Sequence, residues 1–116
     1  MLSEREREAL TDIIENAEAA ARFTVGMSFE EFAADQRTAY AVIRCLEIVS
    51  EASRRLSLAT KERHPQVPWR IVADTGNFYR HSYHRVELDM VWVTLKERLI
   101  ELVEACRSEI ASPPTV

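Results

Sequence analysis

Glycine, proline and long apolar runs are scarce in this sequence. The 116 residues include two glycines and four prolines, whereas the strong helix formers Ala, Glu, Arg and Leu are abundant. No apolar run approaches the roughly 20 residues that a membrane-spanning helix needs. The N-terminal sequence MLSEREREAL also lacks the apolar centre of a secretory signal. We therefore expect a mainly helical, cytoplasmic protein without a membrane segment.

Cysteine is scarce as well, and the two cysteines are far apart. Cys45 and Cys106 each lie within an apolar helical pattern, and neither has a neighbour at the spacing of a metal site. This arrangement predicts two reduced thiols in the core, which fits a reducing compartment.

Apolar residues recur at spacings of three and four through most of the chain, a pattern typical of helices that pack on one face. We expect an all-α fold, a compact up-down bundle of four main helices and one short helix. The main helices are expected at about 4–23, 36–63, 68–81 and 87–108, and the short one after a capping box at Ser28. One domain, residues 1–111, would be followed by a flexible tail, 112–116.

Charge is unevenly distributed along the chain. The net charge is −4, yet residues 54–85 hold seven Arg or Lys and only two acids, Glu62 and Asp74, so this stretch carries +5 and the remainder −9. A basic stretch in an acidic body can bind phosphate groups locally. Solvated helix faces would give the same composition, so charge alone leaves both interpretations open.

Residues 74–85 concentrate side chains capable of chemistry, in the sequence DTGNFYRHSYHR. His81 is the obvious general acid–base candidate, because histidine exchanges a proton near neutral pH. On a helix Asn77 lies four residues earlier on the same face, where its amide can orient the imidazole. Taken alone, such a histidine has a structural interpretation as well as a catalytic one.

Other kinds of site fit the sequence less well. His81 and His84 are three residues apart, but a catalytic zinc normally takes three protein ligands, and His64 is the one histidine left. The two glycines are isolated, so no glycine-rich phosphate loop is present. We therefore expect neither a metal nor a cofactor.

Five blocks of the sequence resemble the HepT-like ribonucleases, a prokaryotic branch of the HEPN (higher eukaryotes and prokaryotes nucleotide-binding) superfamily. The blocks are GMSFEEF at 26–32, AVIRCLEIVSEA at 41–52, PWR at 68–70, HSY at 81–83 and VELDMVW at 86–92. They occur in order and cover nearly the whole chain. The resemblance implies a HEPN-like helical domain, a homodimer, and a toxin that cleaves RNA without a metal and pairs with a minimal nucleotidyltransferase antitoxin.

The motif of this family is Arg, four to six residues, His, any residue and Tyr. The resemblance implies that His81 is the general acid or base and that Tyr83 is the residue that the antitoxin modifies with adenylyl groups. Gly76 stands where the motif arginine belongs, and neither Thr75 nor Asp74 is basic. The candidate phosphate-binding residues that remain are Arg80, Arg70 and Asn77.

Gly76 affects both the expected chemistry and the expected helix. Loss of one transition-state charge partner costs about 10²–10³-fold in rate, and a mid-helix glycine costs about 1 kcal/mol relative to alanine. The sequence leaves open whether the helix is kinked at Gly76 or broken around 74–76. The leading hypothesis is a toxin-type endoribonuclease weakened by this loss. The alternatives are a catalytically degenerate HEPN module that binds RNA, nucleotide or a nucleotidyltransferase, and a purely structural helical dimer.

Overall fold

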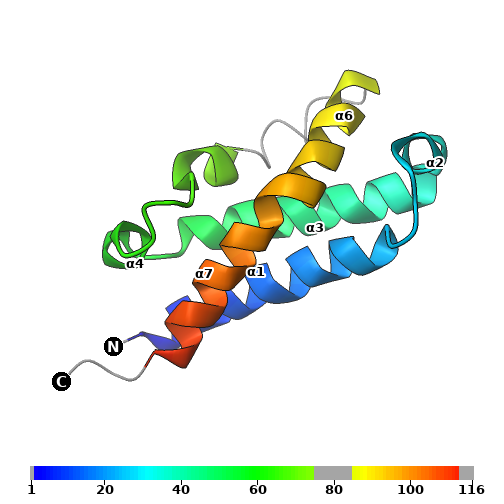
Figure 1. Ribbon diagram of the computed structural model, residues 1–116. Coiled ribbons are helices and arrows are strands. Elements are labelled where there is room, and N and C mark those ends of the chain that lie inside the picture. Colours follow the sequence, from blue (N-terminus) through cyan, green and yellow to red (C-terminus); the bar gives the residue numbers. More distant parts are fainter. Residues whose placement is uncertain (1, 75–84, 113–116) are drawn as a thin grey trace.

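The computed structural model describes residues 2–74 and 85–112. These residues form helices joined by short turns and include no strand, which confirms the predicted all-α class. Figure 1 shows two long helices, α1 and α3, side by side, with a third long rod, formed by α6 and α7, crossing them. The start of α1 and the end of α7 lie at the same end of the molecule.

Helix α1 (Glu4–Phe23) and helix α3 (Gln36–Arg54) run antiparallel and are joined by the short helix α2 (Phe29–Ala34). The bounds predicted for α1 are confirmed, as is the short helix predicted after Ser28, which was expected to end at Ala34. The capping box is present as well: Glu31 N donates to Ser28 Oγ at 3.1 Å, and Ser28 N donates to Glu31 Oε1 at 3.0 Å. These bonds satisfy amides at the helix start that have no partner within the helix.

The prediction of one helix over 36–63 is wrong. Helix α3 ends at Arg54, and a separate short helix, α4 (Leu58–Glu62), follows. Ser57 separates them, because its hydroxyl accepts a bond from Thr60 N at 3.1 Å and so caps α4. The backbone N–H of Ser57 is itself bound to Glu6 Oε1 in α1, at 2.9 Å. A contact with a distant helix therefore fixes this turn.

The last rod has about the predicted extent but is not one regular helix. It consists of α6 (Arg85–Val93), a π-helical turn η1 (Thr94–Arg98) and α7 (Leu99–Ala111). Leu99 N donates to Thr94 O, five residues earlier, as a π turn requires. Because Leu95, Leu99 and Leu102 keep ordinary helical spacing through this turn, the apolar pattern gives no sign of it.

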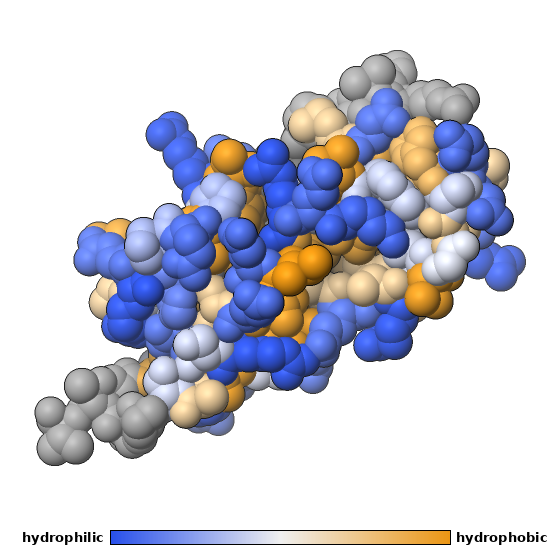
Figure 2. All heavy atoms as spheres, viewed as in Figure 1, coloured by the Kyte–Doolittle hydropathy of each residue, from blue (hydrophilic) through white to orange (hydrophobic). Residues whose placement is uncertain are grey.

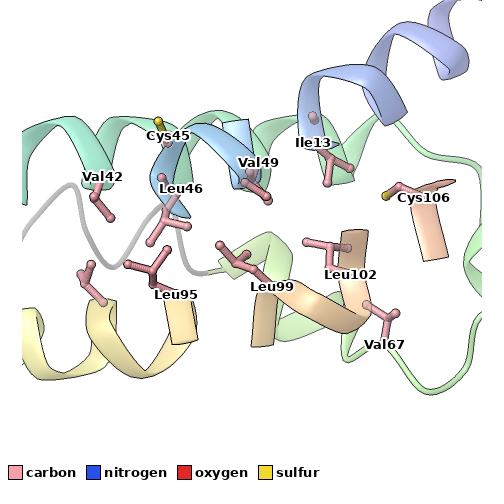
Figure 3. Close-up of a cluster of buried hydrophobic side chains, with 14 of the residues drawn as sticks. Ile13, Val42, Cys45, Leu46, Val49, Val67, Leu95, Leu99, Leu102 and Cys106 are labelled. Atoms are coloured by element: carbon pink, nitrogen blue, oxygen red, sulfur yellow. The ribbon is translucent and has the colours of Figure 1, made fainter. Parts of the chain in front are cut away.

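The core lies where α1, α3 and the last rod meet (Figure 3). The apolar helix faces supply it. On α1 the spacing of three and four also predicted Ala21 to lie on the buried face, but Ala21 is exposed. Cys45 and Cys106 are both free and buried, which confirms the prediction of core thiols. The labelled core side chains are Ile13, Val42, Leu46, Val49, Val67, Leu95, Leu99 and Leu102, with the two cysteines.

Candidate functional site

Of the site residues singled out in the sequence, the structure describes one, Arg70. The others lie between 75 and 84, outside the described residues; they are Asn77, Arg80, His81 and Tyr83, and Gly76 lies there too. The described parts of the chain that lead into this segment are the helix at 69–74 and, on the far side, α6. How these two are held determines where the ends of the segment lie.

The helix at 69–74 begins at a fixed point beside α4. The indole Nε1–H of Trp69 donates to the carbonyl oxygens of Lys61 and His64, both at 3.1 Å. The first bond of the helix runs from Val72 N to Pro68 O at 3.0 Å, which agrees with the predicted helix start at Pro68. Val67, just before it, is buried in the core. The PWR block is therefore the place where this helix is attached to the bundle.

The carbonyl of Ala73 is held by two side chains of α3. Ser50 Oγ donates to Ala73 O at 2.7 Å, and the Arg54 guanidinium donates to the same oxygen. Sequence reasoning did not single out Ser50 or Arg54. The one signal in the sequence was that Ser50 lies in the 41–52 block. A polar residue on a bundle helix does not reveal a backbone partner 19 or 23 residues away, which are the separations of Arg54 and Ser50 from Ala73.

The other side of the segment is held by aromatic packing. Trp92 of α6 packs against Phe29 and Phe32 of α2, with ring centroids 6.1 and 5.1 Å away. The Lys96 amine lies 4.6 Å from the centroid of the Trp92 ring, within the range of a cation–π interaction. These contacts fix α6 against the bundle near the point where the described chain resumes.

Several cations of the basic stretch are used inside the molecule. Arg55 pairs with Asp12 at 2.9 Å, and Arg63 pairs with Glu109 at 2.8 Å. Arg70, by contrast, is exposed and has no partner among the residues that the structure describes. The face seen in Figure 2 is mostly hydrophilic, with hydrophobic residues exposed between the hydrophilic ones. The basic stretch is therefore partly neutralised by pairs within the molecule, whereas Arg70 is exposed and unpaired among the described residues.

Glu109 is a buried carboxylate with two basic partners. Arg63 Nε and Nη2 lie 2.8 and 3.0 Å from its two oxygens, and His64 Nε2 lies 2.9 Å from Oε1. The hydrogen bond from Arg63 holds the pKa of Glu109 below its ordinary value of 4.5, against the opposing effect of burial. His64, the one histidine that remained as a third metal ligand in the sequence, is therefore bound to Glu109.

A second buried carboxylate continues this network. Glu6 Oε1 accepts bonds from Thr60 Oγ1 at 2.6 Å and from Ser57 Oγ at 2.9 Å, and Arg63 Nη2 also donates to Thr60 Oγ1 at 3.0 Å. Burial alone would raise the pKa of Glu6, but the bonds from Thr60 and Ser57 outweigh it and hold the pKa below 4.5. The network connects α1, α4 and α7 at the end of the bundle where the helix at 69–74 begins.

No three His, Cys, Asp or Glu side chains within 2–74 and 85–112 are grouped as metal ligands would be. No helix in the same ranges is long and apolar enough to cross a membrane.

Comparisons with known proteins agree with the resemblance. The family model "Ribonuclease HepT-like" matches residues 13–109. A protein of Thermococcus cleftensis named "Probable ribonuclease HepT" is 38% identical over 96 residues, which cover 83% of this chain and 87% of that protein. A protein of Methanocaldococcus jannaschii named "Putative RNase MJ1380" is 36% identical over 97 residues, with coverages of 83% and 89%. No solved structure matches the chain significantly.

Proposed function

Because the chain belongs to the HepT-like ribonuclease family, we propose that it is a metal-independent endoribonuclease with His81 as its proton-transfer residue. The family match over residues 13–109 carries this proposal, since it spans the whole segment that contains His81, Ser82 and Tyr83. In RNA cleavage a histidine takes the proton of the attacking 2′-hydroxyl or protonates the leaving oxygen. A positioned group of this kind contributes about 10²–10⁴-fold in rate.

Substrate phosphates are held by Arg80, Arg70 and Asn77. Arg70 supports this assignment directly, because it is exposed and unpaired among the described residues. Gly76 leaves the motif position without its cation, so we expect cleavage to be slower by about 10²–10³-fold than with an arginine there.

The protein acts as the toxin of a toxin–antitoxin pair in the cytoplasm. Its antitoxin is a minimal nucleotidyltransferase that transfers adenylyl groups to the Tyr83 hydroxyl, and the active form is a homodimer. The family resemblance supports these assignments. A mass increase of one or more adenylyl units with ATP and the cognate nucleotidyltransferase, absent in Tyr83→Phe, is the expected result; an unmodified Tyr83 would contradict it.

The second candidate is a degenerate HEPN module that binds RNA, nucleotide or a nucleotidyltransferase without cleavage. Gly76 is the observation that favours it. The two candidates differ in what the wild-type protein does to RNA: the ribonuclease cleaves it slowly, whereas the degenerate module binds without cleavage.

The decisive experiment is digestion of a labelled RNA in excess chelator by three proteins: wild type, His81→Ala and Gly76→Arg. The ribonuclease proposal predicts slow cleavage by wild type, none by His81→Ala, and faster cleavage by Gly76→Arg by about 10²-fold or more. Equal cleavage by wild type and His81→Ala would exclude His81 as the proton-transfer group. No cleavage by wild type, with cleavage by Gly76→Arg, would identify the degenerate module.

A further inference from the structure

We propose that Ser50 and Arg54 are positioning residues for the segment that carries His81. They act through the carbonyl of Ala73, and we call this pair of bonds the Ala73 anchor. The catalytic part of the inference rests on the proposed function, whereas its structural part does not.

The Ala73 anchor joins two helices through one backbone oxygen. Ser50 and Arg54 are four residues apart in α3 and therefore lie on one face, towards the helix at 69–74. Ser50 is 1% exposed, and its Oγ lies 2.7 Å from Ala73 O; the Arg54 guanidinium adds a charged donor to the same atom. A carbonyl oxygen has two lone pairs, so α3 can engage both.

The Ala73 anchor lies just before the segment that contains His81, so it can affect where that segment begins. Trp69 holds the start of the helix at 69–74, and the Ala73 anchor holds its carboxyl-terminal side, the last described turn before the residues that lead to His81. A misplacement of about 1 Å in a catalytic group can cost about 10²-fold in rate. Loosening the anchor should therefore lower kcat more than it alters KM.

Two residues of α3 provide matched controls. Ser53 is buried like Ser50, but its hydroxyl donates to Ser50 O within its own helix, at 2.6 Å. Arg44 is an exposed arginine of α3, as Arg54 is, and forms no hydrogen bond or ion pair within the described ranges 2–74 and 85–112. Because Arg54 is exposed, its replacement leaves the core intact.

The first measurement is hydrogen exchange of peptides covering residues 69–74, the described helix that the anchor holds. Loss of one anchoring bond, typical of a protein hydrogen bond, should accelerate exchange by about 3- to 10-fold in Ser50→Ala and in Arg54→Ala. We expect Ser53→Ala and Arg44→Ala to stay near wild type, and Arg54→Lys, which retains a charged donor, to recover much of the protection.

The second measurement is the kinetics of RNA cleavage in the same variants. We expect Arg54→Ala to lower kcat about 10-fold with KM within about twofold, and Arg54→Lys to restore part of kcat. Exchange and kcat in Ser50→Ala and Arg54→Ala that match the two controls would overturn the inference. If Ser50→Ala and Arg54→Ala exchange faster but the wild type does not cleave RNA, the anchor is supported and the proposed function is contradicted.

Discussion

Arg63 binds both oxygens of the buried Glu109 carboxylate, with Nε and Nη2 at 2.8 and 3.0 Å. Glu109 is 7% exposed, whereas the Arg63 side chain is 53% exposed, so one end of the pair is in the interior and the other faces water. The pair joins α7 to the chain just after α4, next to the carbonyls that receive the Trp69 indole. It thereby stabilises the turn after α4, whose carbonyls hold Trp69 at the start of the helix at 69–74.

Arg63→Ala should destabilise the protein by about 1–3 kcal/mol, because the buried carboxylate of Glu109 loses its two guanidinium bonds. Urea unfolding followed by circular dichroism measures this free energy. The matched control is Arg107→Ala, which removes an arginine from an exposed pair with Glu18 whose side chains are 55% and 44% exposed. That loss should be at most about 1 kcal/mol. Equal losses of unfolding free energy in Arg63→Ala and Arg107→Ala would show that the pair with Glu109 stabilises the protein no more than an exposed pair does.

Acid should destabilise the protein through Glu109 and Glu6. Both have pKa values held below 4.5 in the folded state, so the stability they contribute is present above pH 4.5 and is lost as the pH falls through the folded pKa. The free energy of unfolding should thus fall below about pH 4.5. In Glu109→Gln the fall should be shallower, since one of the two carboxylates is gone. An unchanged pH dependence of the unfolding free energy in that variant would exclude Glu109 as a cause of the acid destabilisation.

Apolar spacing and capping residues predicted those helices whose bounds depend on neighbouring residues alone. Helix α1 has a clear apolar face, and its predicted bounds agree with the structure. Ser3 and Ser28 cap α1 and α2, each by accepting a bond from the amide three residues later, and the capping box at Ser28 was predicted. The end of α3 was missed, because the turn at Ser57 depends on Glu6, which lies 51 residues earlier. No spacing within 36–63 carries that information.

The same limit applies to the candidate site. Composition shows that residues 54–85 are basic, but it cannot show that Arg55 is paired with Asp12, 43 residues away, or Arg63 with Glu109. The Ala73 anchor was missed for a related reason, because its acceptor is a backbone atom present at every residue. His81 and Tyr83 could be recognised because the blocks around them resemble the HepT-like ribonucleases. Their catalytic and regulatory roles remain predictions.

The two thiols should be inert in the folded protein. Burial raises the pKa of Cys45, and it raises the pKa of Cys106 to about 12, so little thiolate forms at neutral pH. A disulfide reagent at pH 8 should label neither cysteine on the time scale at which the urea-unfolded chain reacts at both. Cys106, the more buried, should react more slowly than Cys45. Rapid labelling of the native protein would contradict this burial.

Phe32→Ala should destabilise the protein by about 3–5 kcal/mol, because Phe32 is fully buried and a cavity would form beneath Trp92. Tryptophan fluorescence should also shift as the environment of Trp92 becomes more polar. The control is Phe23→Ala at the end of α1, where the side chain is 47% exposed and its loss should cost much less. Similar losses for the two phenylalanines would contradict the burial of Phe32, and unshifted fluorescence would show that Trp92 does not depend on the α2 contact.

Arg70→Ala should weaken RNA binding in a salt-dependent way. The side chain is exposed and unpaired among the described residues, so we expect it to contact one phosphate and to displace one condensed counterion. Affinity for a labelled single-stranded RNA, measured in a His81→Ala background so that the RNA stays intact, should fall at low salt. The slope of log K against log salt should become shallower by roughly 0.7, the value for one contact with a single strand. Arg5→Ala is the control, because Arg5 is an exposed arginine of the acidic first turn of α1 and should leave the slope unchanged. A slope in Arg70→Ala equal to that of the control would exclude Arg70 from the RNA-binding surface and would leave any binding to Arg80 and Asn77.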